Sequence, residues 1–170
     1  YENCLGRRPG PYEQGLEDWT GCLLRGELTG AEVAWGFLDS QEMRRKNLSD
    51  SAYVELLYQA LMGRNPDASG MGTWMDALEK GVSRRYVARG FFGSQEFARI
   101  CRQYGIAQGQ VELSEARDLY PESSGFVKGF YASCLGRTPP GADLNDWTGK
   151  RAAGTVSGPA AATGFFLSEE

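Results

Sequence analysis

The sequence predicts an all-α fold, a helical array of three related units of about four short helices each. Apolar residues recur at the three- and four-residue spacing of one helix face, and no segment alternates convincingly over the length of a strand. Several short motifs also return three times in the same order. Such recurrence is typical of repeat architectures, in which each unit buries its apolar face against the next.

Five anchors define these repeats. Each copy holds a Gly-Arg pair, then a tryptophan, a glycine seven residues after it, a Gly-Phe pair, and a serine with an acid two residues on. The copies are Gly6-Arg7, Trp19, Gly26, Gly36-Phe37, Ser40 and Glu42; Gly63-Arg64, Trp74, Gly81, Gly90-Phe91, Ser94 and Glu96; and Gly136-Arg137, Trp147, Gly154, Gly164-Phe165, Ser168 and Glu170. We therefore expect repeat one at 1–50, repeat two at 51–104, a linker with a short helix at 105–125, and repeat three at 126–170. Because both end repeats are incomplete, we expect the chain to be part of a longer protein with other domains.

The helices of repeat two can be placed in order from their caps. The expected N-caps are Ser51, Asp67, Ser83 and Ser94, since short polar side chains bond the free amides of a first turn. Gly63 and Gly81 end the first two helices in the usual C-terminal role of glycine. The first helix carries an apolar face that comprises Tyr53, Val54, Leu57, Tyr58, Leu61 and Met62.

The repeated residues are best explained as structural. Trp19, Trp74 and Trp147 are expected in the core, because each lies on the apolar stripe of its helix. A glycine inside a helix costs roughly 1 kcal/mol relative to alanine. We therefore attribute the internal glycines to close approach of two helices; they are Gly36, Gly90 and Gly164. The repeated arginines can bond free helix carbonyls or a nearby acid.

Composition excludes several functions. The chain has 18 basic and 22 acidic residues, a net charge of −4, which argues against nucleic acid as a partner. No run of 18 apolar residues is present, so no membrane insertion is expected. There is no histidine and no CxxC pair, which removes the usual catalytic triads and zinc sites. We expect no metal, no cofactor and no enzymatic activity.

Three segments of repeat two resemble a known family. They are Leu61 to Trp74, Gly90 to Phe97 and Cys101 to Ile106, and the family is the bacterial repeat termed domain of unknown function 4214. The resemblance extends over nearly the whole chain in three copies. It implies an all-helical, extracellular module with no catalytic residues to carry over. A more distant likeness, in the Leu-Gly-Arg-x-Pro pattern, is to phycobilisome rod-linker domains, which are helical and non-catalytic.

The sequence departs from this family pattern at two helix entries. Pro9-Gly10-Pro11 and Pro139-Pro140-Gly141 stand where repeat two has Pro66-Asp67. The angle at which those helices begin is therefore expected to differ.

The chain has four cysteines, for which three pairings are possible. The secreted context that the resemblance implies favours disulfides, and the positions within the repeats favour Cys4–Cys22 and Cys101–Cys134. The alternative is four buried thiols in a cytosolic protein.

The aromatic residues that do not recur are the candidates for ligand binding. Trp35 aligns with Arg89 and Thr163, and it lies off the stripe formed by Val33 and Phe37. The other candidates are Tyr12, Tyr86, Tyr104 and Tyr120. An exposed tryptophan is a good anchor for a sugar or a protein. Packing between repeats is the competing interpretation for each residue.

Three functions are consistent with these observations. The first is a non-catalytic module, extracellular or at the bacterial cell surface, that binds a glycan or a surface protein. The second is a structural spacer without a ligand of its own. The third is a carboxylate-based glycosidase, which would require two converging carboxyl groups in a cleft.

Overall fold

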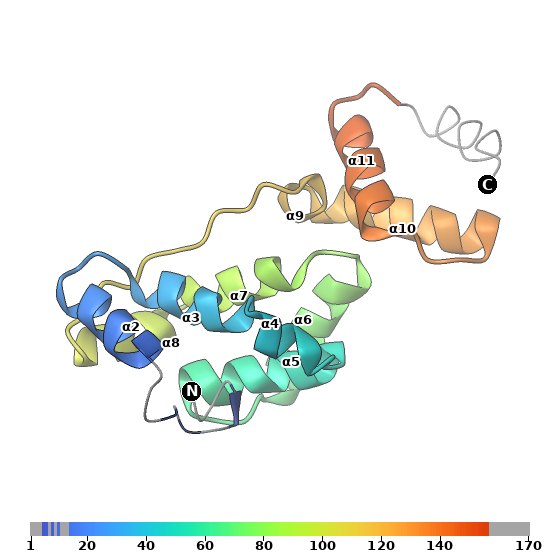
Figure 1. Ribbon diagram of the computed structural model, residues 1–170. Helices are drawn as coiled ribbons and strands as arrows, with labels where there is room; N and C mark the ends of the chain where they lie inside the picture. The colour runs from blue at the N-terminus through green and yellow to red at the C-terminus, as the bar shows by residue number, and fades with distance from the viewer. Residues whose placement is uncertain (1–4, 7, 9, 11–13, 157–170) are drawn as a thin grey trace. The chain divides into compact units, whose positions relative to one another are not determined.

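The computed structural model describes residues 5, 6, 8, 10 and 14–156 (Figure 1). Over these residues it contains helices and no strand, so the predicted all-α class is confirmed. The chain forms two compact units. The first comprises residues 1–76 and 84–112, and the second comprises 77–83 and 113–170. These borders differ from those expected for the repeats, because repeats one and two contribute helices to the same unit.

The first compact unit holds the helices of repeats one and two. In chain order they are α2 (Gln14–Leu24), α3 (Gly30–Leu38), α4 (Gln41–Arg45), α5 (Asp50–Leu57), η1 (Tyr58–Met62), α6 (Ala68–Glu79), α7 (Arg84–Phe92) and α8 (Gln95–Gln103); the last residues of α6 belong to the second unit. The helix η1 continues α5 as a π-helical turn and ends at Gly63, which has a φ of 67°. Val54, Leu57 and Val87 are fully buried in this unit.

Asp67 and Ser94 cap helices as expected, whereas the expected cap at Ser51 is displaced. The Asp67 Oδ1 atom accepts a hydrogen bond from Gly70 N at 2.8 Å, and Ser94 Oγ accepts one from Phe97 N at 3.1 Å. The prediction for Ser51 was wrong, because Ser49 caps α5 by accepting from Ala52 N at 3.2 Å. The earlier start places Asp50 in the first turn, where a carboxylate interacts favourably with the helix dipole.

Two repeated tryptophans lie directly against repeated glycines. A Cβ atom on Gly36 would come within 2.9 Å of the Trp19 ring, and one on Gly90 would come closer still to the ring of Trp74. The indole of Trp74 also stacks on Phe91, with ring centroids 5.3 Å apart. Both tryptophans are partly buried. The glycines therefore allow a close approach between helices that any side chain would prevent; Gly164 lies outside the described residues.

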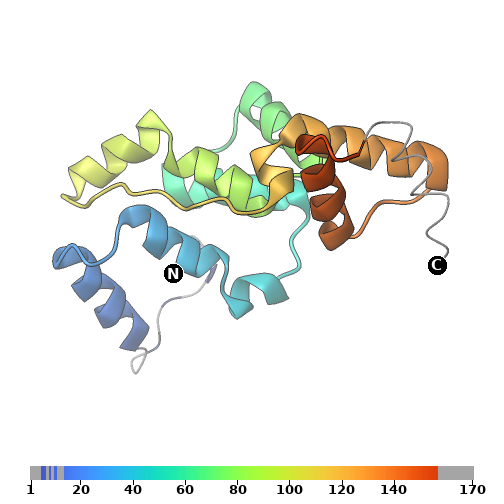
Figure 2. The same cartoon turned by 90° about the horizontal axis from the view of Figure 1, so that it is seen from above.

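An extended segment, residues 105–112, is bound to α3 and α7 rather than free. The carbonyl oxygens of Ala107 and Gln108 accept hydrogen bonds from Gly30 N and Ala31 N at 2.8 and 2.9 Å. The Nε atom of Arg89 donates to Val111 O at 3.1 Å, and Val111 is buried. In Figure 2 this segment, coloured yellow, lies between α3 and α7. The first eight residues of the expected linker are therefore part of the first compact unit.

The second compact unit contains α9 (Ala116–Leu119), α10 (Pro121–Leu135) and α11 (Gly141–Ala152) together with residues 77–83. Its core comprises Val127, Tyr131 and Leu144, with Phe130, Leu135 and Trp147 packed against them. Asp118 is 3% exposed and accepts hydrogen bonds from Ser83 N and Ser83 Oγ at 2.7 and 2.6 Å. Such bonds compensate for the burial of the carboxylate.

Among the described cysteines, none takes part in a predicted disulfide. Cys22, Cys101 and Cys134 are free thiols, and Cys4 lies outside the described residues. Cys101 is enclosed within the first compact unit, where its Sγ atom fills the space beside Gly30, and burial raises the pKa of this thiol. Cys134 is exposed on α10 of the second unit. The matching positions of Cys4 and Cys134 in the repeats therefore gave a wrong prediction of crosslinks.

Among the described residues, no helix combines the length and the apolar character that a membrane span requires.

Candidate functional site

A cavity of about 240 Å³ opens in the first compact unit. It is lined by residues of α3, α4, α5 and α7 and of the loops between them: Trp35, Leu38, Asp39, Met43, Arg44, Leu48, Tyr53 and Arg84. We refer to it as the Trp35 cavity. Leu38, Met43 and Tyr53 are buried and provide apolar surface. The cavity thus combines an apolar interior with charged residues at its border.

The charged residues of the Trp35 cavity are arranged as ion pairs. Arg44 Nη2 donates to Asp39 Oδ1 at 2.7 Å, and both side chains are largely exposed. Arg84 donates through Nε and Nη2 to Asp50 Oδ1 at 3.1 and 2.8 Å. Each guanidinium next to the cavity is therefore neutralised by its own carboxylate.

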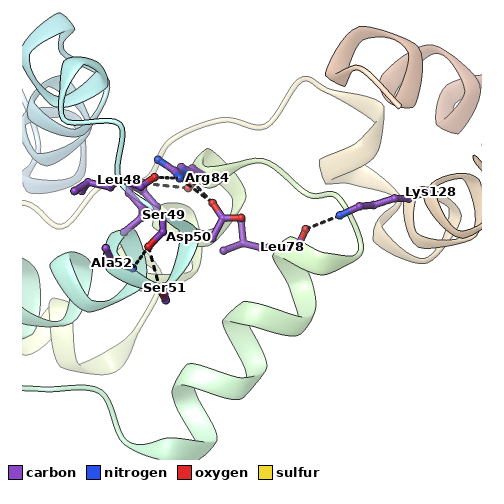
Figure 3. Close-up of polar contacts among 9 residues, drawn as sticks. Leu48, Ser49, Asp50, Ser51, Ala52, Leu78, Arg84 and Lys128 are labelled. Atoms are coloured by element: carbon purple, nitrogen blue, oxygen red, sulfur yellow. Dashed lines mark hydrogen bonds and ion pairs between the residues drawn. The ribbon is translucent and has the colours of Figure 1, made fainter. Parts of the chain in front are cut away.

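Arg84 also fixes the wall of the cavity. Its Nη2 atom donates to Leu48 O at 2.5 Å, and its guanidinium lies over the Tyr53 ring with Cζ 5.0 Å from the centroid. Figure 3 shows Arg84 directed toward Leu48 and Asp50, next to the start of α5. Tyr53 Oη in turn donates to Arg84 O at 3.2 Å. These contacts hold the loop before α5 against α7 and give the cavity a defined shape.

Trp35 is partly buried, which differs from the exposed position expected for it. Its ring lines the cavity and also carries the guanidinium of Arg85, whose Cζ lies 5.1 Å from the ring centroid. Arg85 does not line the cavity, and its buried Nε atom has no hydrogen-bond partner among the described residues. Part of the indole is therefore held by Arg85, and another part faces the open space.

A second cavity of about 100 Å³ lies in the same unit. It is lined by Tyr58, Met62, Arg64, Trp74, Gly90, Phe91, Ser94 and Glu96, and we refer to it as the Trp74 cavity. Most of these residues are repeated anchors. Arg64 makes two parallel bonds to Glu96, from Nε to Oε1 and from Nη2 to Oε2, each 2.9 Å long. Arg64 thus bonds a nearby acid, one of the two roles expected for it.

The Arg64–Glu96 pair perturbs the ionisation of both partners. Hydrogen bonds from the Arg64 guanidinium lower the pKa of the Glu96 carboxyl below its ordinary value of 4.5, and the same bonds raise the pKa of Arg64. A bidentate ion pair of this kind fixes the relative orientation of the two side chains as well as balancing their charges. It joins the end of η1 to the start of α8, so it organises the fold.

The structure brings only one of the predicted ligand-binding aromatics to a described cavity. Trp35 lines the Trp35 cavity, whereas Tyr86 and Tyr104 line neither cavity. Tyr104 is 71% exposed at the end of α8, and Tyr120 is half exposed in the second unit. Tyr12 lies outside the described residues. No cluster of three or more potential metal-ligating side chains is present in the part of the chain that the structure describes.

Sequence reasoning missed the charged residues of the Trp35 cavity, although the repeats contain a signal for them. In the alignment that pairs Trp35 with Arg89, Asp39 matches Gly93 and Arg44 matches Ala98. The departure from the repeat that singles out Trp35 among the aromatic residues therefore also singles out Asp39 and Arg44 among the charged ones.

Comparison with known proteins gives one match. The family model described as domain of unknown function (DUF4214) matches residues 43–101, from α4 to α8, which supports the family resemblance for repeat two. A search of curated proteins and a search of solved structures gave no match.

Proposed function

We propose that this chain is a non-catalytic binding module, extracellular or at the cell surface of a bacterium, that recognises a glycan or a surface protein through the Trp35 cavity. The observation that carries the proposal is the composition of this cavity. It places a partly buried tryptophan and a buried tyrosine beside two ion pairs, around a hollow of about 240 Å³. Aromatic anchors with a few polar groups are typical of binding sites.

The difference between the repeats supports a role outside folding. Trp35, Asp39 and Arg44 have no like residue at the matching positions of repeat two, whereas the anchors that hold the helices together recur. A residue that was needed only to form the repeat would be expected in both copies. The cavity is therefore an addition to the repeat.

The arrangement of carboxylates favours binding over hydrolysis. Each of the two described cavities has one carboxylate in its lining, Asp39 in one and Glu96 in the other, and an arginine binds each of them. Glycoside hydrolysis ordinarily uses two carboxyl groups that face one bond.

We also propose that the family repeat occurs in three copies. Backbone conformation supports this, because six glycines at two matching positions of the repeats have positive φ: Gly6, Gly63 and Gly136 at 70°, 67° and 61°, and Gly26, Gly81 and Gly154 at 69°, 92° and 68°. The guanidinium of Arg64 lies over the Tyr58 ring at 4.9 Å, and that of Arg137 lies over Tyr131 at 5.7 Å, with the same sequence spacing.

The alternative function is a structural spacer, which the likeness to phycobilisome rod-linker domains would favour. A glycan array and a pull-down from bacterial and host surface proteins, both with the full chain, distinguish the two. The binding proposal expects a ligand whose binding is lost in Trp35→Ala while the protein stays folded and loses less than about 2 kcal/mol of stability. Tyr104→Ala removes a more exposed aromatic outside the cavity, so it should leave binding unchanged. If Trp35→Ala costs more than about 2 kcal/mol of stability, Trp35 is a core residue and the site is wrong.

A further inference from the structure

We infer that the Trp35 cavity binds one neutral hexopyranose ring of a glycan. The inference rests on the proposed function and specifies its ligand class. It follows from three properties of the cavity: its volume, the balance of its charges, and the hydrogen-bonding atoms that its ion pairs leave unused.

The volume of the cavity suits one sugar ring. At about 240 Å³ the cavity is smaller than the roughly 300–1,000 Å³ typical of sites for drug-sized ligands. Its buried surface from Leu38, Met43 and Tyr53 is apolar, and Trp35 adds an aromatic surface. A pyranose ring matches such a mixed site, because its C–H groups are apolar while its hydroxyl groups lie around the edge.

The charges favour a neutral ligand. Arg44 is paired with Asp39 at 2.7 Å, and Arg84 is paired with Asp50 at 2.8 Å. An anionic ligand would have to compete with one of these carboxylates, and a cationic ligand with one of the guanidinium groups. Because each of these guanidinium groups is already paired with a carboxylate, the border of the cavity offers a charged ligand little net electrostatic attraction.

The same ion pairs still offer both donors and acceptors. Arg84 uses Nε and Nη2 in its hydrogen bonds to Asp50 and Leu48, and within the described part of the chain Nη1 makes no hydrogen bond. The Arg44–Asp39 contact uses one nitrogen and one oxygen, so Asp39 Oδ2 keeps its capacity to accept a hydrogen bond among the described residues. Hydroxyl groups both donate and accept hydrogen bonds, and they can therefore use both kinds of atom.

Arg85 is the residue that could instead favour an acidic sugar as the ligand. Its guanidinium lies over Trp35, and its Nε atom is buried without a hydrogen-bond partner among the described residues. If Arg85 turned toward the cavity, its charge would favour an acidic sugar. A uronate that differs from a neutral hexose only in the C6 carboxylate is therefore the most discriminating probe.

The test is a titration of the full chain with methyl β-glucoside, methyl β-galactoside and methyl α-mannoside, and with the corresponding glucuronide and galacturonide. Ligand-detected NMR and tryptophan fluorescence provide the readouts. We expect saturable binding of at least one neutral glycoside, at least tenfold weaker binding of its uronate, and a loss of at least tenfold in Trp35→Ala. Trp35→Phe should retain part of the affinity, and Tyr104→Ala should retain all of it.

Tighter binding of a uronate, or no saturable binding of any neutral glycoside, overturns the inference. Other outcomes test the proposed function separately from the hexose ligand. If a surface protein is captured and Trp35→Ala releases it without unfolding, the binding module stands and the hexose ligand is wrong. If neither the sugars, the array nor the pull-down gives a ligand that depends on Trp35, both proposals fail and the spacer remains.

Discussion

The Trp74 and Trp35 cavities are built from similar residue types. They differ in how fully the side chains around them are hydrogen-bonded and packed against one another. In the smaller cavity, Arg64 binds Glu96 through two bonds, and Trp74 fills the space beside Gly90. In the larger one, Arg44 binds Asp39 through a single bond, Arg84 binds only one oxygen of Asp50, and a tryptophan borders open space. The first set recurs along the sequence and the second does not. Residues that recur between the repeats therefore form the contacts that hold the helices together. Residues that do not recur supply the groups that a ligand could use.

Truncation of Trp74 should give the largest effect in this comparison. Trp74→Ala removes the stack on Phe91 and the contact with Gly90, and we expect a loss of about 3 kcal/mol, the low end for a large aromatic because Trp74 is partly buried. Chemical denaturation measures this value. Any loss of binding should parallel unfolding. A stable Trp74→Ala protein that had lost its ligand would show that the binding site lies at Trp74 and that the assignment to Trp35 is wrong.

A methyl group at Gly90 should have the next largest effect. Gly90→Ala forces the Trp74 ring to move, so we expect a loss of about 1–3 kcal/mol, as for other overpacked sites. Gly72→Ala on α6 is the matched control, because no atom lies within 4 Å of its added Cβ. There the same substitution should stabilise the protein by up to about 1 kcal/mol through helix propensity. Equal effects at both positions would contradict the close-packing explanation.

Loss of the Arg64–Glu96 pair should have a smaller, pH-dependent effect. Because the folded pKa of Glu96 lies below its unfolded value of about 4.5, the pair stabilises the protein above that pH and ceases to do so as pH falls through the folded pKa. Glu96→Gln should lower the melting temperature at pH 7 and change it little near pH 3. Glu55→Gln, at an exposed glutamate of α5, provides the control. A pH-independent difference would assign the effect to packing.

The Asp39–Arg44 pair should have the smallest effect on stability. Both side chains are exposed, so Asp39→Asn should change the free energy of unfolding by less than about 1 kcal/mol. If the Trp35 cavity is a binding site, the same variant should weaken ligand binding at least tenfold. A variant with normal affinity would remove Asp39 from the site and narrow it to Trp35, Tyr53 and Arg84.

Local features of the fold were predictable from the sequence because they depend on near neighbours. Apolar spacing identified the helices, and Asp67 and Ser94 cap them as expected. The start of α5 was misplaced because Ser49 and Ser51 are both suitable caps, and the sequence alone does not choose between them. The cysteine prediction failed because matching positions in repeats say nothing about the distance between two sulfur atoms.

The candidate site was only partly predictable. Trp35 was selected because it departs from the repeat, and it does line a cavity. Arg84 could not be joined to it, because it is far away in the sequence and reaches the cavity through tertiary packing of α7 against the loop before α5. The position of a residue in a repeat thus indicates its neighbours within the repeat and leaves contacts between repeats undetermined.

The hydrogen bonds of residues 105–112 have a consequence for where a self-sufficient fragment can be cut. Ala107 and Gln108 complete the first turn of α3, and Val111 fills a buried position next to α7. A fragment limited to residues 43–101, the segment that the family model matches, would lack both α3 and this extended segment. It would expose Cys101, whose Sγ atom lies beside Gly30, and the carbonyl oxygens of Phe92 and Ser94, which accept hydrogen bonds from Gln108 Nε2. The limits of a recognisable sequence segment and of an autonomously folding domain are therefore different in this chain.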